Sequence, residues 1–528
     1  MPGRRPFNLI PHLALWLLGL GLVGGALISE WTVLDGGLGF PLDDTWIHLT
    51  FAQNLAAGEG LAYNPGEPVS GSTAPLWTAL LALVLLLPGN PVMWLKGLGV
   101  VLYLLTLSAT HRLARRHGAS AGAAWLAGAL VAATSWMVWS ALSGMEICLF
   151  TLLTVWGMDL QARERAEPAR PPLALPVLGL ATLARPEGLL LLLLAFADRA
   201  FTTPRGGAGA SLRRPARTLL LPTLAALLPV VVTLRLLGDR TLPTTFGAKT
   251  SWDGWLPDFG YLQTVFGIFF GAHPLISWLA IAGALVLLRP RHPNRGLLPL
   301  LWVVALPLAY SLLSSPGRPL VGNFGRYFFP LFPPLMVLAV RAAESFAQRL
   351  GPHLTIGPWR LRWRAPLLVL LLTPTLAAYI QGLGVFAQNV ANIRDGDLRV
   401  AEWVDATVPP EGVIALQDIG AVGYFTPHRL VDLAGIISPQ VQTAVRASRR
   451  PEDPTGQAGM ERFLAGQQPD LLIVFDRWFP ALVSDRTRFE PVFVFEIPNN
   501  ITMGSDRLIV YRTPWTDIQP LRPLDSHR

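Results

Sequence analysis

The sequence predicts a polytopic α-helical membrane protein that carries a C-terminal α/β domain outside the cytoplasm. Of its 528 residues, 52% are hydrophobic and only 14% are charged, and the mean hydropathy is +0.43. Such a composition is typical of membrane proteins and not of soluble enzymes. Long apolar runs alternate with arginine-rich loops through most of the chain, whereas the last quarter has ordinary globular composition. We therefore expect two domains, at residues 1–388 and 389–528.

The first apolar run, Leu9–Ser29, is long enough to cross a bilayer as a helix. It lacks a small-x-small cleavage site, so we interpret it as an uncleaved first span and not as a signal peptide. Arg4 and Arg5 precede it and place the N-terminus in the cytoplasm. Ten further runs are expected to span: Val92–Thr110, Ala121–Leu142, Ile147–Leu160, Pro172–Leu183, Gly188–Ala197, Leu219–Leu237, Tyr261–Leu288, Leu297–Leu313, Tyr327–Val340 and Ala365–Phe386.

Arginine distribution sets the topology. Arginine clusters lie at residues 112–116, 163–170, 199–217, 289–295 and 341–364, in every second loop. The positive-inside rule then predicts about eleven spans in the plasma membrane, with the C-terminal domain extracytoplasmic. The short run Leu76–Leu87 breaks this alternation if it spans, so we expect a re-entrant or interfacial helix there. The net charge of +8 follows from these loops, and it does not predict a nucleic-acid partner. Cys148 is the only cysteine, so no disulfide can form within the chain.

The C-terminal quarter reads as a small α/β domain. Short runs rich in β-branched and aromatic residues predict strands at Val413–Leu416, Leu471–Phe475, Val492–Phe495 and Leu508–Tyr511. Helical stretches at 399–406 and 461–467 lie among them. Mixed short strands and helices of this kind form a compact layered domain.

Two adjacent carboxylates, Asp43 and Asp44, are the first candidates for chemistry. They lie about four helical turns after the end of the first span, within the segment Pro41–His48. Acids beside a membrane are costly to place and are usually functional. The simpler alternative is a solvated pair of loop acids. We favour a base that acts at the outer membrane surface, because the other unusual polar clusters fall on the same side.

The remaining outer loops bring both acids and bases to that side. The candidate residues for binding an anionic substrate and its hydroxyl groups are Glu146, Arg185, Glu187, Lys249 and Arg326. Arginine and lysine bind phosphate, and carboxylates activate hydroxyl groups. Each has a simpler alternative: Glu187 pairs with Arg185, Glu146 caps a helix, Lys249 is a solvated loop cation and Arg326 marks the end of a span.

The motifs of these loops resemble the GT-C fold glycosyltransferases. The Asp43–Asp44 pair is followed by Gly-Glu-Gly-Leu-Ala-Tyr-Asn-Pro-Gly-Glu at 58–67 and Thr-Ala-Pro-Leu-Trp at 73–77. The resemblance is strongest to the actinobacterial terminal arabinofuranosyltransferase-like branch. Thr244 departs from that branch, where asparagine is usual. Further matching motifs are Ser143–Glu146, Ala184–Gly188, Leu242–Lys249, Gly325–Tyr327, Asp418–Tyr424 and Val431–Gly435.

The resemblance implies an inverting transfer of a hexose or pentose from a polyprenyl-phosphate donor. The acceptor is a hydroxyl group of an envelope glycan, a lipid or a protein. Asp43 would be the base and Asp44 would orient it or the acceptor, although the two roles can be exchanged. Lys249 would hold the donor phosphate, with Arg326 as the alternative, and Glu146 and Glu187 would bind sugar hydroxyls.

Three further side chains in the first outer loop have open roles. Tyr63 and Trp77 either stack on sugar rings or belong to an interfacial aromatic belt. His48 lies four residues after Asp44 and on the same helical face, which suits a divalent metal. No third ligand has suitable spacing, so a divalent metal is possible but unsupported, no other cofactor is predicted, and His48 is a candidate for binding the substrate.

Two functions of other classes remain as alternatives. A transporter or a flippase of a lipid-linked glycan would place ionisable residues near mid-span and often shows an inverted repeat. The sequence has neither feature. A non-catalytic envelope scaffold that binds glycan is the other alternative, and the paired acids argue against it.

Overall fold

The structure, a computed structural model, describes most of residues 9–516. The residues left out within this range are 70, 168–170, 203–220, 237–255, 289–295, 314–324, 350–352, 357–358, 363, 451–452 and 454. The expected span Leu219–Leu237 lies partly outside the described residues, and the loop that contains Lys249 lies wholly outside them.

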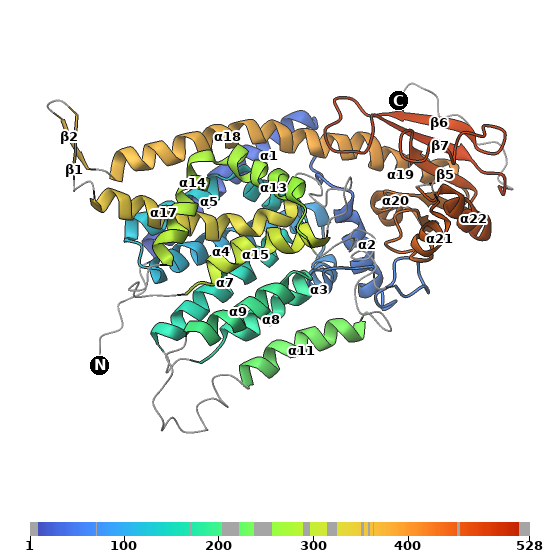
Figure 1. Ribbon diagram of the computed structural model, residues 1–528. Helices are drawn as coiled ribbons and strands as arrows, with labels where there is room; N and C mark the ends of the chain where they lie inside the picture. Colours follow the sequence, from blue (N-terminus) through green and yellow to red (C-terminus); the bar gives the residue numbers. More distant parts are fainter. Residues whose placement is uncertain are drawn as a thin grey trace.

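A bundle of helices forms the larger part of the molecule (Figure 1). The long helix α18 (Arg364–Ile393) runs along α1 (Ile10–Val33), and the Tyr379 hydroxyl donates to the Leu22 carbonyl between them. Helices α4 (Pro91–Arg116) and α7 (Ile147–Ala166) pack together in the bundle. The other bundle helices are α8 (Ala174–Ala184), α9 (Gly188–Thr202), α11 (Leu221–Leu236), α15 (Leu298–Leu313) and α17 (Phe332–Arg349).

Within the described residues, four helices are long and apolar enough to cross a membrane, or up to six if each of two bent pairs is one span. The pair α5 (Ala121–Ala133) and α6 (Ser135–Leu142) bends by 61°, and the pair α13 (Phe259–Ala272) and α14 (Pro274–Leu287) bends by 113°. His273 lies at the second break, and the residue before a proline is disfavoured in the α-conformation. The run Tyr261–Leu288 is therefore two helices, and the expected number of about eleven spans stays a prediction.

Two short helices lie between the bundle and the C-terminal domain (Figure 1). Helix α2 (Asp44–Ala56) begins at the second acid of the Asp43–Asp44 pair, and α3 (Pro75–Leu85) packs against it. Helix α3 lies in the segment that we expect not to span. Its 11 residues are too few to cross a bilayer upright, but so are the 11 residues of α8, which lies in an expected span.

The C-terminal domain begins where α18 continues, through a π-helical turn at Arg394–Leu398, into α19 (Arg399–Thr407). Its five described strands form one sheet in the order β4-β3-β5-β7-β6. Strands β4, β3 and β5 are parallel to one another, and β7 is antiparallel to both of its neighbours, β5 and β6. The bounds are β3 Val413–Leu416, β4 Arg429–Asp432, β5 Leu471–Phe475, β6 Glu490–Glu496 and β7 Arg507–Arg512. The helices that accompany the sheet are α20 (Gly420–Phe425), α21 (Gln440–Ser448) and α22 (Gln457–Gln467).

The sequence-based strands agree with β3 and β5 residue for residue, because both are buried apolar runs of the kind that central parallel strands require. Strand β4 was missed. It has only four residues, and it begins with an exposed arginine and ends in a buried aspartate. At the opposite end of the molecule, a hairpin joins β1 (His353–Ile356) and β2 (Trp359–Arg362) (Figure 1).

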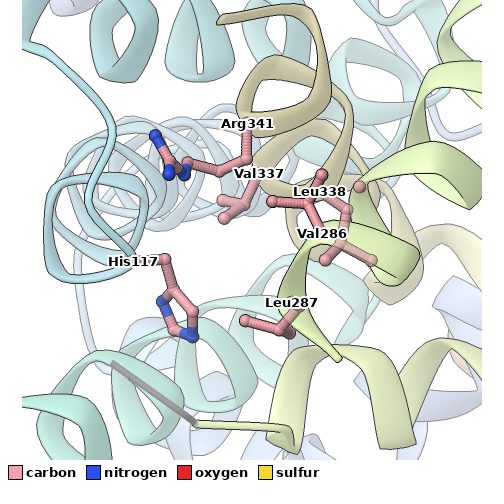
Figure 2. Close-up of a pocket in the computed structure, with 7 residues that line it drawn as sticks. His117, Val286, Leu287, Val337, Leu338 and Arg341 are labelled. Atoms are coloured by element: carbon pink, nitrogen blue, oxygen red, sulfur yellow. The ribbon is translucent and has the colours of Figure 1, made fainter. Parts of the chain in front are cut away.

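A small pocket lies near that opposite end, between α14, α17 and the residue that follows α4 (Figure 2). Valine and leucine side chains line most of it, and His117 and Arg341 also line it. Arg341 already donates to the Gly118 carbonyl and pairs with Glu344. Lys96, near the start of α4, binds the Leu142 carbonyl just before the loop of Glu146. His117 is roughly 30 Å from Lys96 along α4, so this pocket is separate from the acid-rich loops.

Candidate active site

Asp43 lies where the chain enters α2, and the C-terminal domain covers it. Its carboxylate accepts the backbone N–H of Gly420 at 2.6 Å and the backbone N–H of Ala421 at 2.7 Å. Burial raises the pKa of Asp43 to about 7, the two N–H groups oppose this shift, and the charge of Asp44 adds to it. A carboxylate with a pKa near neutrality is suited to take a proton and release it again.

Only glycine fits at position 420. A Cβ atom there would lie 2.2 Å from the Asp43 carbonyl oxygen and 2.6 Å from its Oδ1. The loop between β3 and α20 therefore approaches Asp43 by backbone alone. Tyr63 also binds this loop, because its hydroxyl donates to the Ile419 carbonyl at 2.6 Å.

Asp44 points to a different partner. It forms an ion pair with Arg326, which is 4% exposed and begins the 3₁₀ helix η2 (Arg326–Leu331). The Nε and Nη1 atoms of Arg326 have no hydrogen-bond partner among the described residues. Buried guanidinium N–H groups normally have partners, so these two are available to a ligand with anionic oxygens.

A second charged group surrounds Arg185. This buried side chain bridges Glu146 and Glu187, and the Tyr310 hydroxyl also donates to Glu187. His48 Nε2 lies 3.4 Å from Glu146. Burial by itself raises the pKa of Glu146, but the charges of Arg185, His48 and Arg326 outweigh it and lower the pKa to about 2. Glu146 is therefore held as a carboxylate.

Tyr327 joins the two groups. The Arg185 guanidinium lies 5.0 Å from the centre of its ring, and that of Arg326 lies 5.6 Å from it. The Tyr310 ring stacks on Tyr327 at 5.6 Å. The structure thus brings together seven residues that the sequence analysis selected: Asp43, Asp44, His48, Glu146, Arg185, Glu187 and Arg326.

Two selected aromatic residues serve as framework in this structure. Trp77 is fully buried, and its indole N–H donates to the Gly144 carbonyl at 3.1 Å. Tyr63 is 3% exposed and binds Ile419 as described above. Neither ring is open for stacking on a sugar. Lys249 and Thr244 lie outside the described residues.

The sequence analysis did not select two further acids near the Asp43–Asp44 pair. Asp397, in the π-helical turn, is 3% exposed, and its Oδ2 has no hydrogen-bond partner among the described residues. Asp418 follows β3, and burial followed by the charges of Asp43 and Asp44 raises its pKa well above the usual value. Asp418 was part of a quoted motif, but nothing in the sequence placed Asp397 beside residues more than 300 positions away. Among the described residues, no cluster of three or more histidine, cysteine or acidic side chains could hold a metal ion.

Comparison with known families gives a match to one part of the chain. A family model described as a domain of unknown function (DUF8728) matches residues 388–515. No curated protein matches the chain.

Comparison with solved structures covers nearly the whole chain. ArnT from Cupriavidus metallidurans bound to undecaprenyl phosphate is similar with a TM-score of 0.56 at 15% identity, over 93% of this chain and 97% of that one. The apo form of the same protein is similar with a TM-score of 0.55 at 16% identity, over 95% of this chain and 99% of that one. The Archaeoglobus fulgidus oligosaccharyltransferase tethered to an acceptor peptide is similar with a TM-score of 0.53 at 12% identity, over 92% of this chain and 74% of that one. The chain therefore shares the fold of these proteins.

Proposed function

We propose that the protein is an inverting glycosyltransferase that moves a sugar from a polyprenyl-phosphate donor to a hydroxyl acceptor at the outer face of the plasma membrane. One arrangement carries this proposal. Asp43, with a pKa of about 7, adjoins Asp44, and Asp44 holds the buried Arg326 with two N–H groups free of protein partners in the described structure. A base thus lies beside an anion-binding group.

The proposed reaction is a single displacement. The acceptor oxygen attacks C1 of the donor sugar, and Asp43 takes the hydroxyl proton as the new C–O bond forms. The bond between C1 and the phosphate oxygen breaks, and its electron pair stays on the lipid phosphate. Attack opposite the leaving group inverts the anomeric centre.

Charge on the phosphate grows as that bond breaks, and fixed cations stabilise it without reorganising. Arg326 is our first candidate for this role, and Lys249 remains a second one from the sequence. Asp44 orients the guanidinium. Glu146, His48, Arg185 and Glu187 form the polar wall that we assign to the sugar hydroxyls, because the two carboxylates can accept hydrogen bonds from hydroxyl groups and the Arg185 guanidinium can donate to them.

The fold similarity supports the class of donor. ArnT was solved with undecaprenyl phosphate bound, and the archaeal oligosaccharyltransferase AglB with dolichol phosphate. The branch nearest to the arabinofuranosyltransferases remains a proposal that rests on the sequence motifs, and so do the sugar and the acceptor.

Transfer by the purified protein tests the proposal. Detergent-solubilised protein is incubated with radiolabelled polyprenyl-phosphate sugars and envelope acceptors, and the products are separated from the lipid donor. Labelled acceptor should form with the wild-type protein and not with Asp43→Asn. The flippase alternative predicts the opposite pattern in proteoliposomes: movement of the labelled lipid between leaflets with no transfer in either variant.

A further inference from the structure

A buried ion pair, Glu30–Lys96, lies behind the candidate site and takes no part in the proposed reaction. Glu30 is fully buried near the end of α1, and Lys96 is 4% exposed near the start of α4. Their charged atoms are 3.0 Å apart. Burying two charges is costly, and a well-packed apolar pair often stabilises a protein equally well. The position of the pair therefore calls for a reason.

Both members of the pair also bind backbone just before a site loop. Glu30 Oε1 accepts the Gly39 N–H at 2.8 Å, four residues before Asp43. Lys96 Nζ donates to the Leu142 carbonyl at 3.2 Å, four residues before Glu146. Lys96 also lies over the Phe40 ring, at 5.7 Å from its centre. One ion pair thus binds the backbone just before two different loops of the site, the loop of Asp43 and the loop of Glu146.

The same two loops meet again beside the reacting groups. Thr45, next to Asp44, donates its hydroxyl to the Ser143 carbonyl at 2.8 Å. A Cβ at Gly144 would lie 2.5 Å from Thr45, so the loops are in close contact there. The segments 39–45 and 142–146 are therefore connected twice: through the Glu30–Lys96 pair, which binds Gly39 and Leu142, and directly through the hydrogen bond from Thr45 to Ser143.

We infer that Glu30 and Lys96 are positioning residues, which set the placement of Asp43 and Asp44 relative to Glu146 and His48. Their contribution comes through directed hydrogen bonds to Gly39 and Leu142, and not only through charge compensation. A misplacement of about 1 Å in an active site can lower a rate by about 100-fold. Loss of the Glu30–Lys96 pair and its two backbone contacts should therefore slow transfer without removing the groups that bind the donor.

Two double variants separate these roles. Glu30→Met/Lys96→Met removes the charges and both backbone contacts. Glu30→Gln/Lys96→Met also removes the charges but keeps an amide oxygen for Gly39. If the pair only balances charge, the two variants should behave alike. A matched control is Arg165→Met/Asp198→Leu, because Asp198 is also a buried acid that pairs with a cation and accepts a backbone N–H, that of Leu297 at 2.8 Å. Along α7, Arg165 is roughly 27 Å from the end that adjoins Glu146.

Hydrogen exchange with mass spectrometry provides the first measurement, on the full-length protein in detergent. We expect faster exchange at residues 39–46 and 143–147 in Glu30→Met/Lys96→Met, a smaller increase in the glutamine variant, and none in the control. Unchanged exchange in the first variant would refute the inference. If that variant does not fold, the wild-type protein and the glutamine variant decide. Fast exchange of the Gly39 amide in the wild-type protein overturns the inference. Protection of that amide in both proteins, with faster exchange at residues 143–147 in the glutamine variant alone, supports it.

Kinetics provide the second measurement, and this part rests on the proposed function. The expected result for Glu30→Met/Lys96→Met is a fall in kcat of about 10- to 100-fold with little change in the KM for the lipid donor. Glutamine at position 30 should restore part of kcat, and the control should leave it unchanged. A wild-type protein that transfers no sugar would refute the proposed function, whereas the exchange measurement would still test the positioning role.

Discussion

Asp44 and Arg326 are 282 positions apart in the chain, yet they form an ion pair that leaves the Nε and Nη1 atoms of the arginine without a partner in the described structure. The pairing uses Nη2, and the N–H groups on Nε and Nη1 point away from Asp44. Arginine presents its N–H groups in a rigid fork that matches the oxygens of a phosphate. The pair therefore links the acid loop to the group that we propose holds the leaving phosphate.

Arg326→Lys tests that link. Lysine keeps the positive charge beside Asp44, but it cannot serve Asp44 and a phosphate with a planar fork. We expect binding of a polyprenyl phosphate to weaken by about 10-fold, which corresponds to about 1.4 kcal/mol. Binding of the lipid to detergent-solubilised protein measures this. Arg341→Lys, on α17 but far from the site, is the control and should bind like the wild type. Equal affinity in all three proteins would exclude Arg326 as the phosphate ligand.

Asp43→Asn and Asp44→Asn should differ in kind. The Asp43 change removes the proposed base, so transfer should fall by about 100- to 10,000-fold while donor binding stays close to wild type. The Asp44 change releases Arg326 and should mainly weaken donor binding. Single-turnover transfer and lipid binding, measured side by side, distinguish the two. If Asp43→Asn is active and Asp44→Asn is not, the roles are exchanged; activity in both and in the double variant would end the glycosyltransferase proposal.

How far the site could be predicted follows from how local each signal is. Asp43, Asp44 and the Ala184–Gly188 turn are visible in the sequence because each is a contiguous motif. The hydrogen bonds from Gly420 and Ala421 to Asp43 were not predictable, since they join segments almost 380 residues apart. The framework roles of Tyr63 and Trp77 also depend on such contacts, with Ile419 and Gly144. Apolar runs predicted most of the described helices. The break at His273 has a local signal in Pro274, but the 113° angle between the two helices needs the three-dimensional packing.

The pH dependence of transfer should reflect Asp43. The base must be deprotonated, so the rate should rise with pH along a limb with a midpoint of about 7. The same shift acts on stability in the opposite direction. The folded-state pKa is raised above the unfolded value, so the contribution of this group is greatest at low pH and is lost as pH rises through about 7. A rate profile under saturating donor measures the first effect, and a flat profile between pH 5 and 8, about one to two units either side of the midpoint, would remove Asp43 as the base.

Topology can be tested with single cysteines in a Cys148→Ala background. Ser484 is exposed in the C-terminal domain and Gln348 is exposed near the end of α17. The positive-inside rule places the first outside and the second in the cytoplasm. An impermeant maleimide should therefore label Ser484→Cys in intact cells, and Gln348→Cys only after permeabilisation. The reverse pattern would place the acid-rich loops in the cytoplasm.

Gly420→Ala tests whether the C-terminal domain sets the properties of the base. The added Cβ would lie 2.2 Å from the Asp43 backbone oxygen, so the loop must move away and its hydrogen bonds to the carboxylate must weaken. Those bonds lower the pKa of Asp43 against the effect of burial. Their loss should raise that pKa, so the rising limb of the rate profile should move to higher pH, and the rate at neutral pH should fall.

Gly466→Ala is the matched control for that experiment. Gly466 lies within α22, and a Cβ there meets no atom within 4 Å. Alanine is more favourable than glycine in a helix by up to about 1 kcal/mol, so this variant should be at least as stable as the wild type and equally active. If Gly420→Ala keeps both the wild-type rate and the wild-type midpoint while remaining folded, the contacts from Gly420 and Ala421 do not control Asp43. Movement of the midpoint in Gly420→Ala alone would tie the C-terminal domain to the chemistry of the site, because Gly466→Ala changes the same domain without touching the acid.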